Sequence, residues 1–141
     1  MSFASQLRTR DPDPAGRRWI YVPYDQLTDR IGPLSRIPAG EAGVVLLEAP
    51  AKADRRPGHR WKLALILAHQ RHFALAQAAR GVAVRYVFSP GSYADALRGL
   101  GPLTVMRPAE RELRVVPREG WLTNPRTVRG RVRRIPLREV L

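Results

Sequence analysis

Two carboxylates and a histidine stand where side chains would carry out acid/base chemistry. Asp25 and Glu48 each follow a short apolar run closely, and His59 follows a polar, basic loop. Such a set can supply a general acid and a general base, which gives one hypothesis, a small hydrolase or transferase. The same residues also suit structural roles, with Asp25 as a helix N-cap and Glu48 as a hydrogen-bond acceptor at a strand end. The structural roles are favoured because no spacing here is specific to a catalytic site.

The common catalytic and nucleotide-binding motifs are absent. The chain has no GxGxxG, no GxxxxGK[ST] and no GxSxG. It also has no Cys, which excludes disulfides, thiolate zinc sites and cysteine-held iron–sulfur clusters. His69 and His72 stand three residues apart on an expected helix, and no carboxylate joins them nearby. We therefore predict no metal site.

The elements that would position these residues alternate between strands and helices. Apolar, β-branched and aromatic runs predict strands at 19–22, 44–47, 82–88 and 103–106. Apolar periodicity predicts a long helix over 59–80, ended by Gly81, and a short helix over 93–100. This alternation is typical of an α/β fold, a Rossmann-like open parallel sheet with helices on both faces.

The carboxyl ends of the expected strands form the rim where ligands bind in such sheets. These ends carry Tyr24 to Leu27, then Glu48, and then Arg107 to Glu110. Carboxylates and amides bind hydroxyl or ring N–H groups well and repel phosphate. The rim therefore favours a ligand with hydroxyl or ring N–H groups over a nucleotide phosphate.

The net charge of +13 gives a second hypothesis, a basic nucleic-acid-binding module. The expected contact is weak and non-specific, through an Arg cluster near the C-terminus: Arg126, Arg129, Arg131, Arg133 and Arg134. A simpler interpretation also holds, because only Lys52 and Lys62 among the 25 basic residues are Lys. That bias is typical of a GC-rich coding sequence, so part of the charge carries no function.

The chain divides into three parts. Residues 1–18 mix Pro, Arg and Asp with little periodicity and predict a flexible leader. Residues 19–114 hold the expected α/β domain, and residues 115–141 form a basic tail that is expected to be poorly ordered. No apolar run approaches the length of a membrane span, and no secretory signal is visible. We expect a cytoplasmic protein without a membrane partner.

The ordered polar residues around the long helix resemble those of the deoxyribodipyrimidine photolyase-related proteins. These form the bacterial cryptochrome/photolyase branch whose full-length members carry an iron–sulfur cluster. The first strand with Asp25-Gln26-Leu27 and the segment Arg107 to Glu112 resemble family segments as well, so the resemblance covers residues 19 to about 114. The matching residues of the central segment are Glu48, Ala51, Ala53, His59, Lys62, Arg71, His72, Phe73, Ala74, Gly81, Val84 and Tyr86.

The resemblance implies an antenna domain of the photolyase type. Some relatives hold a lumazine-type antenna chromophore in this domain, and by motif position Asp25, Gln26, Leu27 and Glu48 would bind it. In full-length relatives a helical domain binds FAD, the iron–sulfur cluster and damaged DNA. Tyr24 stands where the family usually has Gly, and its side chain would fill space that a ring ligand needs.

These points together predict a truncated, antenna-like domain that is not an enzyme by itself. FAD and an iron–sulfur cluster are not expected in this chain, because it has no Cys and no helical C-terminal half. The expected ligands are a small aromatic chromophore or a partner, such as a separate helical flavin-binding polypeptide. Residues 115–141 resemble a shortened form of the family's linker.

Overall fold

The computed structural model describes residues 1–10, 12–49, 60–91, 93–106 and 137–139. Its centre is a five-stranded sheet with the order β3-β2-β1-β4-β5, in which all neighbouring strands are parallel. This arrangement confirms the predicted Rossmann-like open parallel sheet. The strands are β1 (Arg18–Tyr21), β2 (Ala42–Glu48), β3 (Ala83–Phe88), β4 (Leu103–Val105) and β5 (Leu137–Glu139).

Strand β2 is buried along its whole length between β1 and β3. Its apolar run is continuous rather than alternating, because helices cover both faces of the sheet. Val44 pairs with Ile20 on one side and with Val84 on the other. The sequence predicted this strand over 44–47, and the structure extends it by two residues before the run and by Glu48 after it.

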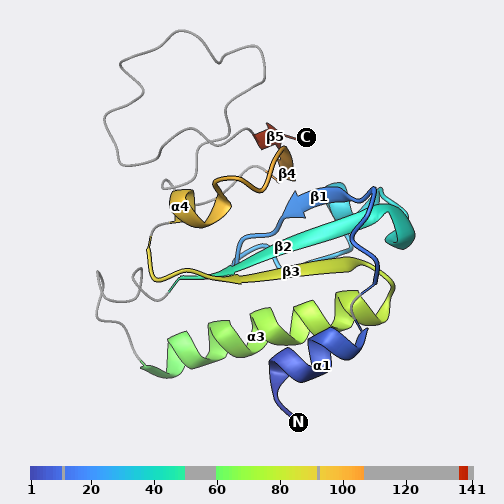
Figure 1. Ribbon diagram of the computed structural model, residues 1–141. Helices are drawn as coiled ribbons and strands as arrows, with labels where there is room; N and C mark the ends of the chain where they lie inside the picture. The colour runs from blue at the N-terminus through green and yellow to red at the C-terminus, as the bar shows by residue number, and fades with distance from the viewer. Residues whose placement is uncertain (11, 50–59, 92, 107–136, 140–141) are drawn as a thin grey trace, which may run out of the picture.

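Helices lie on both faces of the sheet, as predicted (Figure 1). Helix α3 (Arg60–Ala79) covers one face, and α4 (Tyr93–Leu97) covers the other. Side chains therefore divide between two cores along each strand: Ile20 and Val22 enter the α3-side core, whereas Tyr21 enters the α4-side core. The alternation follows from the two-residue side-chain period of a strand.

The end of α3 has the geometry that the glycine at position 81 predicts. Gly81 has a φ of 88°, and the Val82 N–H donates to the Gln77 carbonyl at 3.1 Å. The Gly81 N–H donates to the Ala78 carbonyl at 3.0 Å. These two bonds form a Schellman motif, which satisfies the last carbonyls of the helix.

One close approach on the α4 side of the sheet also depends on glycine. The Trp19 ring of β1 lies over Gly43 of β2, where a Cβ atom would stand only 2.6 Å from the indole. The Arg85 guanidinium of β3 lies 4.1 Å from the centre of the same ring. The three residues join the neighbouring strands through a cation–π contact.

Two elements differ from the sequence prediction. Residues Phe3–Arg10 form helix α1 in what was expected to be a flexible leader, and Leu137–Glu139 form β5 within the expected poorly ordered tail. Helix α1 forms because the Ser2 hydroxyl caps it and because Phe3 and Leu7, one turn apart, pack against the α3-side core. The rest of the tail, including the Arg cluster at 126–134, lies outside the described residues.

The connection from β1 to β2 contains no α-helix. Asp25 stands in a turn, and the two short 3-10 helices Pro33–Ser35 and Ala39–Glu41 follow. Asp25 therefore does not cap a helix. No helix among the described residues is long and apolar enough to cross a lipid bilayer.

Candidate functional site

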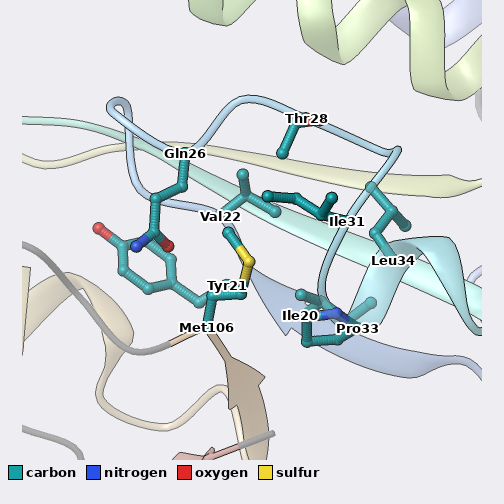
Figure 2. A pocket seen from close by; sticks show the side chains of 9 residues that line it. All are labelled: Ile20, Tyr21, Val22, Gln26, Thr28, Ile31, Pro33, Leu34 and Met106. Carbon is teal, nitrogen blue, oxygen red and sulfur yellow. The ribbon is translucent and has the colours of Figure 1, made fainter. Parts of the chain in front are cut away.

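The topology of the sheet places one candidate site. The chain runs outward from β1 through β2 to β3, then crosses to β4 on the other side of β1. The strand order therefore reverses between β1 and β4, and open α/β sheets bind ligands beyond the carboxyl ends of the strands at such a point. A small hollow lies there (Figure 2), lined by Ile20, Tyr21, Val22, Gln26, Thr28, Ile31, Pro33, Leu34 and Met106.

The hollow is mostly apolar and almost filled. Only about 10 Å³ is open to the centre of a water molecule, which is about what one water needs. Figure 2 shows the Met106 side chain reaching into the middle of the hollow, while the Gln26 amide lies beside the Tyr21 ring. Small-molecule pockets are much larger, at roughly 300–1,000 Å³. A ring ligand therefore does not fit the hollow unless Met106 moves.

The three predicted ligand residues of the turn after β1 have separate surroundings. The Asp25 side chain is exposed, and Leu27 packs against the α3-side core. Gln26 is the one of the three that lines the hollow. Its backbone N–H donates to the Pro23 carbonyl at 2.9 Å, which fixes the turn. Tyr24 is half-buried and does not line the hollow.

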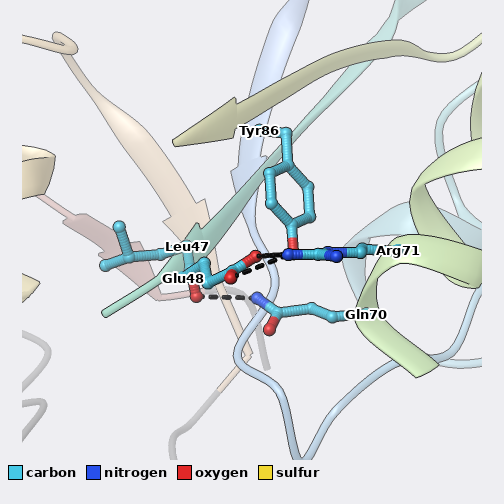
Figure 3. Close-up of polar contacts among 5 residues, drawn as sticks. All are labelled: Leu47, Glu48, Gln70, Arg71 and Tyr86. Atoms are coloured by element: carbon cyan, nitrogen blue, oxygen red, sulfur yellow. Dashed lines mark hydrogen bonds and ion pairs between the residues drawn. The ribbon is translucent and has the colours of Figure 1, made fainter. Parts of the chain in front are cut away.

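Glu48 belongs to a different cluster, on the α3 side of the sheet (Figure 3). Its two carboxylate oxygens accept hydrogen bonds from the Arg71 guanidinium at 2.9 and 3.1 Å. The Tyr86 hydroxyl donates to one of these oxygens at 2.7 Å. One residue before Arg71 on α3, the Gln70 amide donates to the Leu47 carbonyl at 2.7 Å. These bonds attach α3 to the ends of β2 and β3.

The electrostatics of this cluster favour the protonated forms of Tyr86 and Arg71. Burial, and then the bond to Glu48, raise the pKa of the Tyr86 hydroxyl well above its usual value. The hydrogen bond to Glu48 is the largest cause that raises the pKa of Arg71. A Tyr that resists ionisation and an Arg that resists deprotonation form a structural cluster rather than an acid/base pair.

Helix α1 covers the same cluster. The Phe3 ring meets the Tyr86 ring edge-on, with centroids 4.7 Å apart and planes at 68°. The Arg71 guanidinium lies 5.6 Å from the centre of the Phe3 ring. Both contacts have favourable geometry, and together they shield the Glu48 ion pair from one side.

The surroundings of Asp25 and Glu48 do not support the hypothesis of acid/base catalysis. Asp25 is exposed at its turn, and Glu48 is held by Arg71 and Tyr86. His59 lies outside the described residues. In the described ranges, no three His, Asp or Glu side chains gather closely enough to hold a metal ion.

Sequence reasoning missed the partners of Glu48 and a second polar link. Arg71 and Tyr86 stood in the resemblance motif, which was a signal, but the motif gave them no role. For Asp29, no sequence pattern indicated a role. It accepts a hydrogen bond from Gln77 at 3.0 Å and pairs with Arg80, and these contacts hold the β1–β2 connection against the end of α3. The bond from Gln77 is the first cause that lowers the pKa of Asp29.

Comparison with known proteins supplies the family. None of the curated proteins compared matches the chain. The model of the family described as deoxyribodipyrimidine photo-lyase-related protein matches residues 18–121. This range begins at β1, includes the hollow and the Glu48 cluster, and covers well over half of the chain. The chain therefore belongs to the deoxyribodipyrimidine photo-lyase-related protein family.

Proposed function

We propose that the chain acts as an antenna-like α/β domain that binds a small aromatic chromophore of the lumazine type and performs no repair chemistry alone. The observation that supports this proposal is the mostly apolar hollow at the strand-order reversal, which contains a single side-chain amide, that of Gln26. Flavin and iron–sulfur chemistry belong in this proposal to a separate helical partner polypeptide.

Binding requires that the hollow open. Met106 follows β4 directly and has an unbranched, flexible side chain, and Ile31, which also lines the hollow, is largely exposed. Both side chains can leave the hollow without emptying either core. The Gln26 amide oxygen would then accept a hydrogen bond from the edge of a ring. Asp25, Leu27 and Glu48 stay predictions as ligand residues.

A fluorescence titration of the purified protein with a lumazine tests this proposal. We expect Met106→Ala to tighten binding several-fold, because it removes the side chain that fills the hollow. We expect Gln26→Leu to weaken binding about two- to tenfold, since one hydrogen bond contributes roughly 0.5–1.5 kcal/mol. Gln6→Leu, the same substitution on α1, is the matched control and should leave the affinity for the lumazine unchanged.

Two results would contradict the proposal. Equal binding to the parent, Met106→Ala and Gln26→Leu proteins would show that the hollow is not the site. Light-driven repair of pyrimidine dimers by this chain alone would show that it is a complete enzyme.

The net charge of +13 supports a second proposal, weak non-specific contact with DNA. Because β5 belongs to the sheet, the test should leave residues 137–139 in place. Replacing the five Arg residues at 126–134 by Ala should reduce DNA retention at low salt and flatten its salt dependence. Unchanged DNA retention in this variant would show that the five Arg residues do not contribute to DNA contact.

A further inference from the structure

The face of α3 directed away from the sheet carries an unexpected row of apolar residues. The buried residues of this helix are Gln70, Ala74, Gln77 and Ala78. On the opposite side, Trp61 is 83% exposed and Leu65 is 56% exposed. Helix α1 lies against α3 (Figure 1), and in that contact neither Trp61 nor Leu65 becomes buried. A soluble helix normally places polar residues on this outer side.

The exposed row has the spacing of a helix–helix interface. Trp61, Leu65, Ala68 and His72 follow one another at steps of four, three and four residues, and all four are exposed. This is the spacing of the inward-facing positions of a coiled coil, which keeps a seam of side chains directed at a partner helix. We name these four residues the outer seam.

The residues beside the outer seam are basic. At 3.6 residues per turn, Lys62 and His69 flank the seam on one side and Arg71 flanks it on the other. Neither α3 nor α1 contains an Asp or Glu. The first turn of α3 carries Arg60 and Lys62 and no acidic residue, so both oppose the positive end of the helix dipole. An acidic partner would relieve this unfavourable arrangement.

Charge also indicates which kind of molecule would bind the outer seam. A second copy of the chain would place one basic flank against another. The chain's own segments 50–59 and 107–136 contain more basic than acidic residues. A nucleic acid would match the charge but would leave the Trp61 and Leu65 side chains without apolar contacts. A helix from another protein, with apolar residues at the same spacing and acidic residues beside them, satisfies both features.

We propose that the outer seam of α3 docks an amphipathic helix of a separate protein whose seam is flanked by glutamate or aspartate. Trp61 and Leu65 would supply the apolar anchors, since aromatic residues dominate most interface energetics. Lys62 would select an acidic flank, as charged residues beside coiled-coil seams select partners, whereas the Arg71 guanidinium is already paired with Glu48. This proposal is independent of chromophore binding.

Fluorescence anisotropy with a labelled synthetic helix tests the docking. The probe is about three heptads long, with leucines at the four-three spacing and glutamates beside them. We expect micromolar binding that weakens as salt rises, and a loss of at least about tenfold in the Trp61→Ala/Leu65→Ala double variant. The matched control is Ile31→Ala/Phe88→Ala, which removes two side chains of similar exposure elsewhere and should bind like the parent.

A second pair of reagents tests the charge. A probe with lysines in place of the glutamates should not bind the parent protein. Lys62→Glu should weaken binding of the glutamate probe by about two- to fivefold, the usual effect of one exposed pair. Circular dichroism checks that each variant folds, and Met106→Ala should leave probe binding unchanged because it alters only the hollow.

Several outcomes would overturn the proposal. Equal binding of the glutamate and lysine probes, or undiminished binding to the Trp61→Ala/Leu65→Ala variant, would do so. Trp61-dependent binding to phosphatidylserine vesicles without probe binding would assign the seam to a lipid surface. Dimerisation that the double variant abolishes, without probe binding, would assign it to a second copy.

Discussion

The ion pair between Arg71 and Glu48 allows the sharpest prediction about stability. The Glu48 side chain is 11% exposed and the Arg71 side chain 44% exposed. Among the described residues, Arg71→Met would leave this mostly buried carboxylate with the Tyr86 hydroxyl as its one side-chain donor. Breaking a fully buried pair costs about 3–5 kcal/mol, and an exposed pair contributes only about 0.2–1 kcal/mol. Because solvent screens the Arg71 end, we expect a loss of about 2 kcal/mol.

Urea unfolding followed by circular dichroism measures this loss and its cause. If the cost comes from the uncompensated carboxylate, Glu48→Gln should offset part of it, and the double variant should be more stable than Arg71→Met alone by about 1 kcal/mol. Arg98→Met is the matched control, because its pair with Asp95 is about half exposed at both ends; it should cost less than about 0.5 kcal/mol.

The reasoning would be refuted by either of two results. An Arg71→Met variant within about 0.5 kcal/mol of the parent would show that the ion pair contributes no more than a surface pair. A double variant that is less stable than Arg71→Met would show that the carboxylate is not the source of the cost.

Four further predictions each concern one residue. Because the pKa of Tyr86 is raised, its contribution to stability is present below the ordinary value of 10.0 and is lost as pH rises through the folded-state pKa. Tyr86→Phe should therefore make the free energy of unfolding less dependent on pH in the alkaline range. Because the pKa of Asp29 is lowered, its contribution to stability is present above the ordinary value of 3.8 and is lost as pH falls through the folded-state pKa. Asp29→Asn should therefore lower the free energy of unfolding by about 1 kcal/mol at pH 7 and by little in acid. Arg17→Met should cost about 1.5–3 kcal/mol in urea unfolding, since its guanidinium donates to four backbone carbonyls, three of them at the amino end of the sheet. An unchanged unfolding midpoint would contradict this role. Gly43→Ala should cost about 1–3 kcal/mol because the added methyl meets the Trp19 ring, and Trp19→Leu should recover part of that loss if the clash is the cause.

The strands and the long helix were predictable because their signals are local. Val44 to Leu47 is apolar without interruption, and Gly81 ends a periodic segment, so neither depends on distant residues. Helix α1 was missed because its short segment offers only Phe3 and Leu7 as core-facing residues, and its stability comes from packing on α3. Strand β5 was missed because its pairing depends on the register with β4 rather than on any pattern of its own.

The candidate site was predictable only at the level of topology. Sequence placed Gln26 and Glu48 at the carboxyl ends of neighbouring strands, and both are there. Sequence did not indicate which face of the sheet each side chain would take. Glu48 lies in the α3-facing register, where Arg71 and Tyr86 meet it across 23 and 38 residues of sequence. Such non-local pairs produce no periodic pattern in the sequence.

The position of β5 bears on how the chain folds. Strand β4 pairs with β1 on one side, and its other edge is satisfied by β5, whose residues come after the whole 107–136 segment in sequence. During synthesis the backbone groups along that edge of β4 therefore wait for their β5 partners until residues 137–139 have emerged. Closing a parallel pair between segments so far apart in sequence is slow, and an open strand edge can recruit another chain in the interval. Folding yield, more than final stability, should respond to changes in residues 137–139.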